Sequence, residues 1–221
     1  MKVSLRKLGA PGVLKVGGGI QAILGGKADI YSQEINDIMT HPNMQLAPKT
    51  EDTNKNKSET DTKHVAQTVD LASPVNGKFT DLSEVHDDVF SQKMMGEGFA
   101  VQPTDGEIYS PVNGTIMSIF KTKHAIGIKT PSGLEVMLHM GLDTVELNGA
   151  PFTIHVKEGD KITTDTHLAT VDLDQIKDAG KDPVILTLIT NTKDYVDKTN
   201  NLVQSGEQIK VHAQVFEVLT K

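Results

Sequence analysis

The sequence predicts a mainly β protein built around an antiparallel β-sandwich or barrel-like domain. From Val69 onward, short apolar runs recur with turn residues between them, a pattern typical of sandwiches. The 221 residues include 19 glycines and nine prolines, which favour short strands joined by turns over long helices. Aromatic residues make up 4% and Trp is absent, so we expect a core of Val, Ile, Leu, Met and Ala.

Composition removes several classes of function. The absence of Cys excludes a disulfide framework, a thiolate metal site and a cysteine nucleophile. A net charge of −7 argues against a nucleic-acid-binding surface. No apolar run is long enough to span a bilayer, and the start of the chain lacks the apolar block of a signal peptide. We therefore expect a cytoplasmic protein.

Residues 1–44 predict a small, incomplete α+β fragment. We expect a short helix, two strands at GVLKV (12–16) and IQAIL (20–24) separated by three glycines, and a second helix from near Ala28. Two strands and two helices of this size make a thin core, because very small units usually need partners.

Residues 45–70 predict a flexible linker. They include APKTEDTNKNKSETDTKHVAQT, which is nearly free of apolar side chains and cannot bury enough surface to offset its chain entropy. The sandwich domain is therefore expected over residues 71–221. Within it, SPVNG occurs twice, at 73–77 and 110–114, and each Asn-Gly suits a tight turn. We interpret these as two similar turns, although a duplicated strand-turn unit would produce the same repeat.

Two histidines bracket a predicted antiparallel hairpin, TKHAIGIKTPSGLEVMLHMG (122–141). If its loop has four residues, 130–133, His124 lies directly opposite His139, with Cβ atoms roughly 4.5–5.5 Å apart. This register places Ile126 and Met137 outward beside the histidines, as an apolar docking surface. A three-residue loop would put the two rings on opposite faces.

Adjacent imidazoles have several uses. A zinc site would need a third ligand, and neither HxH nor HExxH spacing occurs nearby. A general acid and base would need a substrate pocket. In a phosphoryl relay, one neutral ring attacks phosphorus while the other donates a hydrogen bond to the transferred group. Two incidental surface histidines are the remaining interpretation.

Motifs around the hairpin resemble a known family. GEGFAVQPTDG, SPVNGTI, TKHA and LHMGLDTVEL occur in the order and spacing of the glucose-type IIA domain of the bacterial sugar phosphotransferase system. The resemblance runs from about Leu71 to the end of the chain and implies an antiparallel β-sandwich. It implies that Nε2 of His139 accepts a phosphoryl group from the phosphocarrier protein HPr. It also implies that His124 hydrogen-bonds the phosphate, that Thr122 orients His124, and that Asp143 is the acid beside the site.

The same resemblance suggests a docking face and partners. Val89 and Phe90 match apolar residues that rim the family's docking face, to which we add Ile126, Met137 and Val145 as partner-binding residues. The expected function is a phosphotransferase that accepts phosphate from phospho-HPr and passes it to the cysteine of a IIB domain during sugar uptake. No cofactor and no metal ligand is expected.

Residues 1–44 resemble the second half of a glucose-type IIB domain, through LRKLGAPGVLKVGGGIQAILGGKADIYSQEINDIM. That family places its phosphorylated Cys before this segment, and this chain has no Cys. We therefore expect transfer to a IIB domain on another polypeptide, and a membrane association only through a IIB or IIC partner. The alternatives are a regulatory IIA protein that binds partners according to its phosphorylation state, and a zinc hydrolase that uses His124 and His139.

Overall fold

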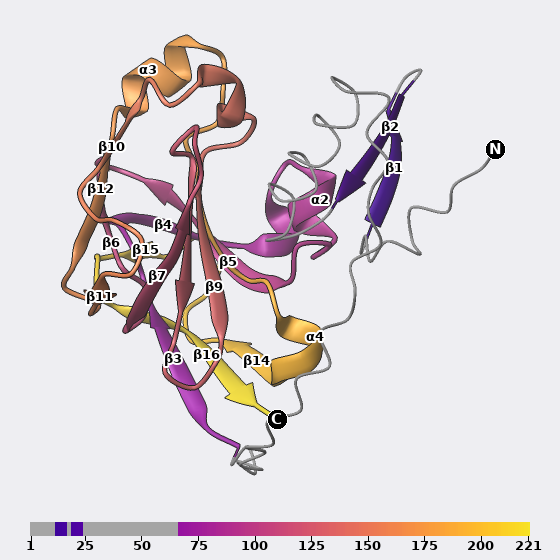
Figure 1. Ribbon diagram of the computed structural model, residues 1–221, viewed down its shortest axis with the longest axis vertical. Coiled ribbons are helices and arrows are strands. Elements are labelled where there is room, and N and C mark those ends of the chain that lie inside the picture. Colours follow the sequence, from indigo (N-terminus) through magenta and orange to yellow (C-terminus); the bar gives the residue numbers. More distant parts are fainter. Residues whose placement is uncertain (1–11, 17–18, 24–65) are drawn as a thin grey trace, which may run out of the picture. The chain divides into compact units, whose positions relative to one another are not determined.

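The computed structural model describes residues 12–16, 19–23 and 66–221 (Figure 1). The chain divides into two compact units, residues 1–64 and 65–221. In the first unit, β1 (Gly12–Val16) and β2 (Gly19–Ile23) pair antiparallel with Val16 opposite Gly19. The two predicted strands are therefore confirmed, the second starting one residue earlier than expected. The two predicted helices, and the linker up to residue 65, lie outside the described residues.

The second unit begins earlier than predicted. Residues 68–70, assigned to the linker from their polar composition, belong to β3 (Thr68–Ala72). β3 pairs antiparallel with β16 (Gln214–Thr220), Thr68 lying opposite Leu219. The linker boundary is thus corrected to before Thr68. The reason is that β3 is an edge strand, which keeps polar side chains on its exposed positions while Leu71 is fully buried.

Three antiparallel sheets make up this unit, which confirms the mainly β prediction. The largest has the strand order β11-β7-β8-β9-β13-β5-β4-β15. Its strands are β4 (Gly77–Asp81), β5 (Glu97–Pro103), β7 (Gly114–Ile119), β8 (Ala125–Lys129), β9 (Glu135–Met140), β11 (Lys161–Ile162), β13 (Ile185–Ile189) and β15 (Gln208–Ile209). The smaller sheets have the orders β10-β12-β6 and β14-β16-β3. Their remaining strands are β6 (Glu107–Tyr109), β10 (Phe152–Ile154), β12 (His167–Val171) and β14 (Val196–Asn201).

Only short helices connect these strands within residues 66–221. They are the 3-10 helices η3 (Leu82–Glu84) and η4 (Thr144–Leu147), and the α-helices α2 (Asp88–Ser91), α3 (Leu173–Asp178) and α4 (Thr192–Tyr195). Figure 1 shows α3 at one end of the unit and β3, β16 and β14 at the other. No helix among the described residues is long and apolar enough to cross a membrane.

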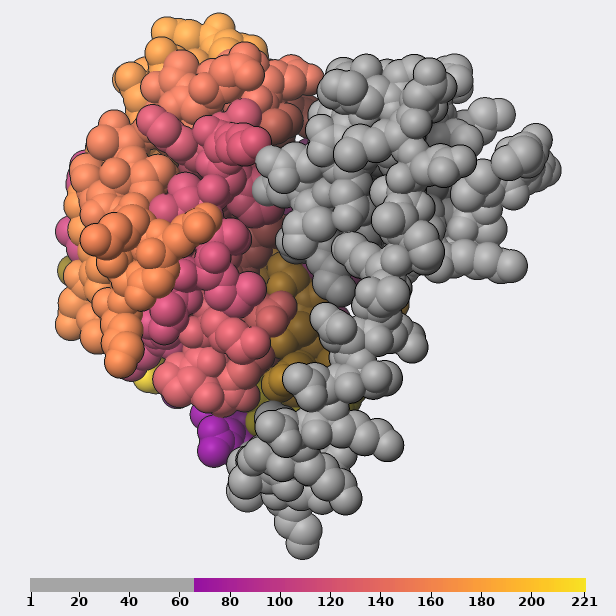
Figure 2. Space-filling model, in the orientation of Figure 1, coloured from indigo at the N-terminus to yellow at the C-terminus, as the bar shows by residue number. Residues whose placement is uncertain are grey.

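The large sheet carries buried apolar side chains on both faces. One face contributes Ile126, Leu138 and their neighbours to the main sandwich core, where Phe79 and Phe99 also pack. The other face supports a separate group, here called the second cluster: Leu82, Val85, Phe90, Ala100, Ala125, Met137, Leu142, Val184, Leu186 and Leu188. In the space-filling view, residues 114–140 adjoin residues 150–178, in keeping with the pairing of β11 and β7 (Figure 2).

The two SPVNG turns are structural counterparts. In each, the buried serine hydroxyl donates to the carbonyl of the valine two residues later, at 2.7 Å for Ser73 and 2.6 Å for Ser110. The residue before each serine donates its amide to the proline carbonyl of the other turn, at 2.9 Å for Ala72 and 2.8 Å for Tyr109. This reciprocal arrangement favours a duplicated strand-turn unit over two unrelated turns.

Candidate functional site

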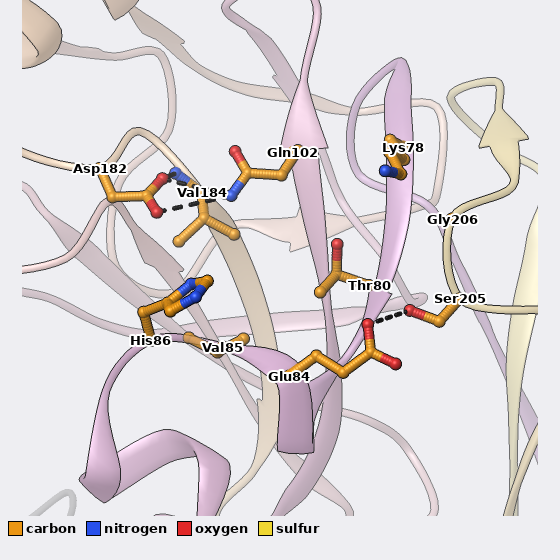
Figure 3. Close-up of a pocket in the computed structure, with 10 residues that line it drawn as sticks. All are labelled: Lys78, Thr80, Glu84, Val85, His86, Gln102, Asp182, Val184, Ser205 and Gly206. Carbon is orange, nitrogen blue, oxygen red and sulfur yellow. Dashed lines mark hydrogen bonds between the residues drawn. The ribbon is translucent and has the colours of Figure 1, made fainter.

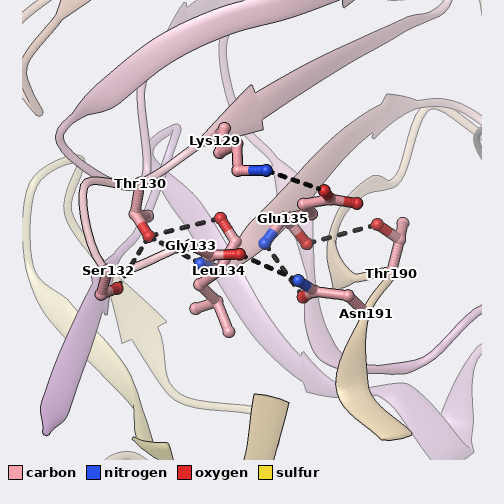
Figure 4. A network of polar contacts seen from close by, with 8 residues as sticks. All are labelled: Lys129, Thr130, Ser132, Gly133, Leu134, Glu135, Thr190 and Asn191. Carbon is pink, nitrogen blue, oxygen red and sulfur yellow. Dashed lines mark hydrogen bonds and ion pairs between the residues drawn. The ribbon is translucent and has the colours of Figure 1, made fainter. Parts of the chain in front are cut away.

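The hairpin β8–β9 has a different register from the predicted one. Ala125, not His124, lies opposite His139, and the loop is the five residues 130–134. The four-residue prediction is therefore wrong. The loop is closed by hydrogen bonds from the amide of Thr130 to the carbonyl of Leu134 (2.9 Å) and from the amide of Leu134 to Thr130 Oγ1 (3.0 Å; Figure 4).

The buried pattern explains why the five-residue loop is preferred. In this register Ile126, Ile128, Val136, Leu138 and Met140 all face the main core. A shift by one residue would turn one strand's apolar set to the opposite face. The predicted outward position of Ile126 is accordingly corrected, because this side chain is 0% exposed and belongs to the main core.

The histidine rings nevertheless lie side by side. His124 precedes the first residue of β8 and follows Lys123, whose φ of 57° breaks the alternation of the strand. The carbonyl of His124 still accepts from the amide of Met140 at 2.8 Å, which ties it to the end of β9. The centroids of the His124 and His139 rings are 5.0 Å apart, with an interplanar angle of 78°.

Phenylalanines extend the pair into a row of four rings, here called the ring row. Phe120 contacts His124 at 5.3 Å between centroids, and Phe90 contacts His139 at 5.1 Å, both edge to face. Phe90 is held by the short helix α2, where the Asp87 carboxylate accepts from the Phe90 amide at 3.3 Å. The sequence analysis named Phe90 but not Phe120. The signal that could have indicated Phe120 is its position four residues before His124.

Thr122 fixes one nitrogen of His124. A hydrogen bond of 2.6 Å joins Thr122 Oγ1 and His124 Nδ1. The His124 side chain is 8% exposed, so this bond holds a largely buried ring in a single orientation.

His139 is enclosed on one side. Its Nδ1 atom is buried and makes no hydrogen bond of acceptable geometry within the described part of the chain. Burial and, to a smaller extent, the neighbouring His124 together lower the pKa of His139 to about 3, although the backbone of Gly141 partly opposes this shift. The imidazole is therefore neutral at physiological pH, as a nucleophilic ring must be.

The remaining expected residues lie at different depths. Met137 is 6% exposed and packs in the second cluster, on the sheet face that carries His139. Val89 is half-buried in α2, and Val145 is 49% exposed in η4. Among the expected docking residues that the structure describes, Val145 is the one most open to solvent.

Asp143 is separate from the ring row in its contacts. It is exposed, has a φ of 56° and precedes η4. No hydrogen bond joins it to His139 in the described region. Instead, Lys181 Nζ donates a hydrogen bond of 2.6 Å to Glu146 Oε2, and this bond, together with the charges of Glu146 and Asp143, raises the pKa of Lys181. Within residues 66–221 and the two described N-terminal strands, no three acidic, Cys or His side chains gather in a metal-binding arrangement.

Comparisons with known proteins match this part of the chain. Residues 69–195 match the family described as phosphoenolpyruvate-dependent sugar phosphotransferase system, EIIA 1. A relative is the PTS system glucose-specific EIICBA component of Streptococcus pneumoniae serotype 4, 46% identical over 184 residues, which are 83% of this chain. The match spans 25% of that relative's length. A similar solved structure is the glucose permease IIA from Mycoplasma capricolum, with 32% identity and a TM-score of 0.59, covering 68% of this chain and 96% of that one.

Proposed function

Because the chain belongs to the EIIA 1 family of the phosphoenolpyruvate-dependent sugar phosphotransferase system, we propose that it is a phosphocarrier for sugar uptake whose accepting atom is Nε2 of His139. One observation carries this assignment: a neutral imidazole with Nδ1 enclosed and a second imidazole alongside. The enclosed Nδ1 leaves Nε2 as the nitrogen that a phosphoryl group can reach.

The transfer itself needs little from the protein beyond position and charge. The lone pair of Nε2 forms a bond to phosphorus as the bond from phosphorus to its donor atom on HPr breaks, and that electron pair returns to HPr. Since the pKa of His139 is lowered to about 3, no proton has to leave the ring before attack. Phe90 on one side and His124 on the other limit rotation of the His139 ring.

His124 stabilises the transferred group. With Thr122 donating to Nδ1, the neutral tautomer of His124 carries its proton on Nε2. That N–H then donates to an oxygen of the phosphoryl group on His139 and spreads its negative charge. The charge of Asp143 acts on Lys181, and we assign Asp143 to the rim that partners touch rather than to the reacting atoms.

The docking face consists of the ring row and the apolar side chains around it. Val89, Phe90, Met137 and Val145 belong to it, and Ile126 does not. HPr is the proposed donor, and a IIB cysteine on another polypeptide is the proposed acceptor, because this chain has no Cys. Residues 1–44 are proposed to be IIB-like, and a IIC partner would provide the connection to the membrane, as the name of the EIICBA relative suggests.

Labelling tests the assignment directly. The chain is incubated with enzyme I, HPr and labelled phosphoenolpyruvate, comparing wild type with His139→Ala, His124→Gln and the exposed control His155→Ala. We expect acid-labile, base-stable label in all but His139→Ala. We expect His124→Gln to accept label but to transfer it slowly to a IIB domain. Label retained by His139→Ala, or absent from wild type, would contradict the proposal.

A further inference from the structure

Methionine thioethers are the only sulfur groups of this chain, because its 221 residues include eight Met and no Cys. A thioether is a soft, apolar group that oxidants convert to a polar sulfoxide. Among the methionines that the structure describes, Met117 is 44% exposed, whereas Met137 and Met140 are 6% and 0% exposed. Met94 and Met95 lie between these limits, since both are partly buried. The proposed transfer chemistry uses none of these sulfur atoms.

Met95 combines partial exposure with a place beside the site. It packs against the second cluster, whose members include Phe90 and Met137, while part of its surface stays open to solvent. The ring of Phe90 in turn lies against His139, with centroids 5.1 Å apart. Met95 is therefore part of the packing around the ring that is proposed to accept phosphate.

The turn that carries Met95 is fixed on both sides. The Met94 amide donates to the Val89 carbonyl at 3.0 Å, which bonds the turn to α2. On the other side, Gly96 has a φ of 114°, and a Cβ there would lie 2.0 Å from the Ile189 carbonyl oxygen. Backbone packed this closely against β13 leaves the turn little freedom to move outward. A polar group on the Met95 side chain must therefore be accommodated within the second cluster.

The second cluster is also open to small molecules. Val85 and Val184, two of its members, line a cavity of about 410 Å³ beside β4 and β5 (Figure 3). A volume of this size holds several water molecules. An oxidant as small as hydrogen peroxide can therefore reach the cluster at this cavity, and it can reach Met95 directly through the exposed part of that side chain.

We propose that Met95 is an oxidation site at which a hydroperoxide reversibly lowers phosphoryl acceptance; this inference rests on the proposed function. The thioether sulfur attacks one peroxide oxygen, the O–O bond breaks, and the second oxygen takes up a proton and leaves as water. Sulfur is oxidised by two electrons, and the peroxide is reduced by two. The sulfoxide oxygen then places a hydrogen-bond acceptor against a cluster of apolar side chains. Because an acceptor without a donor is unfavourable there, Phe90 loses its packing against His139.

Controlled oxidation of the full chain tests this. Wild type, Met95→Leu and Met117→Leu are treated with hydrogen peroxide in the presence of a metal chelator, and catalase removes the oxidant before phospho-HPr is added. Met117→Leu is the matched control, since Met117 is the most exposed methionine of the described residues and belongs to neither of their apolar clusters. Peptide mass spectrometry follows sulfoxide at each methionine, and each rate of label acceptance is compared with the untreated rate of the same variant.

The expected losses differ between the two sites. In wild type, kcat/KM for phospho-HPr should fall about tenfold in step with sulfoxide at Met95. Met117→Leu should fall equally, whereas Met95→Leu, which keeps an apolar side chain of similar volume, should change less than about twofold. If Met95→Leu unfolds early, the wild-type time course carries the test. Without oxidant, Met95→Gln introduces a polar group at the same place and should accept label about tenfold more slowly than Met95→Leu.

Enzymatic reduction provides a second readout. Methionine sulfoxide reductases A and B should restore both the thioether and the rate, which damage to a histidine would not allow. The inference is overturned if Met95 stays unoxidised while Met117 converts fully, if acceptance survives complete sulfoxide formation at Met95, or if reduction does not restore the rate. Equal rates for Met95→Gln and Met95→Leu also overturn it. These results in a chain that labels at His139 before oxidation overturn this inference alone, whereas unlabelled wild type before oxidation overturns the proposed function.

Discussion

At the scale of single residues, burial of a titratable ring links the site to stability. The pKa of His139 is about 3 in the folded chain, against 6.5 for an unperturbed histidine. Between these values the unfolded chain binds a proton at this position and the folded chain does not. Folding stability should therefore be fully present above about pH 6.5 and should decline as the pH falls toward 3.

Replacement of His139 should remove that acid sensitivity. As the pH falls below 6, the free energy of unfolding should decrease less steeply in His139→Gln than in wild type. The difference should be up to about 1.4 kcal/mol for each pH unit. Urea denaturation at pH 7, 6, 5 and 4.5 measures the difference, with the exposed His155→Gln as control. Parallel curves for wild type and His139→Gln would show that the ring titrates normally.

A second residue-scale prediction concerns a buried hydroxyl. Thr187 is 0% exposed, and its Oγ1 has no hydrogen-bond partner within the described residues. It lies between Ile185 and Ile189 on the main-core face of β13. Thr187→Val keeps the shape and removes the unsatisfied group, so the free energy of unfolding should rise by about 1 kcal/mol.

Thr144 provides the matched control. It is equally buried, but its Oγ1 donates to the Met140 carbonyl at 2.7 Å. Thr144→Val should therefore lower the free energy of unfolding by about 1–2 kcal/mol. Chemical denaturation of the two variants side by side measures both values. A loss of stability in both would mean that the Thr187 hydroxyl does have a stabilising contact.

At the scale of elements, one side chain holds the loop of the histidine hairpin. Asn191, between β13 and α4, donates from Nδ2 to the carbonyl of Gly133 at 2.9 Å and accepts at Oδ1 from the amide of Glu135 at 3.0 Å (Figure 4). The adjacent Thr190 amide donates to the carbonyl of Glu135 at 2.9 Å. These bonds continue the β9–β13 ladder past its last paired residues.

Loss of this side chain should weaken the hairpin. Asn191→Ala leaves two backbone groups without partners, and the free energy of unfolding should fall by about 2 kcal/mol. Asn191→Asp retains the acceptor and should lose about half of that. Asn200→Ala, which removes an exposed amide bonded to Glu217, is the control and should change stability by less than about 0.5 kcal/mol. Urea denaturation compares the three. Equal effects for Asn191→Ala and Asn200→Ala would contradict a role for Asn191 in the loop.

This hairpin also marks the limit of prediction from sequence. Alternating side chains predicted both strands, and the histidines that bracket the hairpin, together with the motif match, led to the proposed site. The loop length was missed because it depends on which residues share the main core and on Asn191, 58 residues from Gly133 in the chain. His124 lies just before β8 and follows Lys123, which has a positive φ, a local departure that a regular strand pattern does not predict.

At the scale of the whole molecule, short apolar runs were sufficient to predict the antiparallel architecture, since most core residues come from alternating strands. Composition was a poorer guide to boundaries. Residues 68–70 were assigned to the linker because they are polar, as the exposed face of an edge strand is. Only the pairing of β3 with β16 shows that these residues belong to the sheet. The second cluster also escaped prediction, because apolar residues on both faces of a sheet do not alternate with polar ones.

The boundary at residue 65 leads to the last prediction. Residues 65–221 form a compact unit, and its first and last strands are joined by β3–β16 pairing and by a hydrogen bond of 2.9 Å from the Gln67 amide to Thr220 Oγ1. A chain that starts at residue 65 should therefore melt cooperatively and accept label from phospho-HPr at the rate of the full chain.

A chain that starts at residue 73 is the informative comparison. It lacks β3, which exposes the edge of β16 and removes the fully buried Leu71 from the core. Loss of a buried leucine alone costs about 2–5 kcal/mol, a large fraction of the stability of a domain of this size. The shorter chain should unfold at a markedly lower temperature and lose label acceptance. Equal melting temperatures for the two chains would place the start of the folded unit after β3. If the chain from residue 65 accepted label more slowly than the full chain, residues 1–64 would contribute to phosphoryl acceptance.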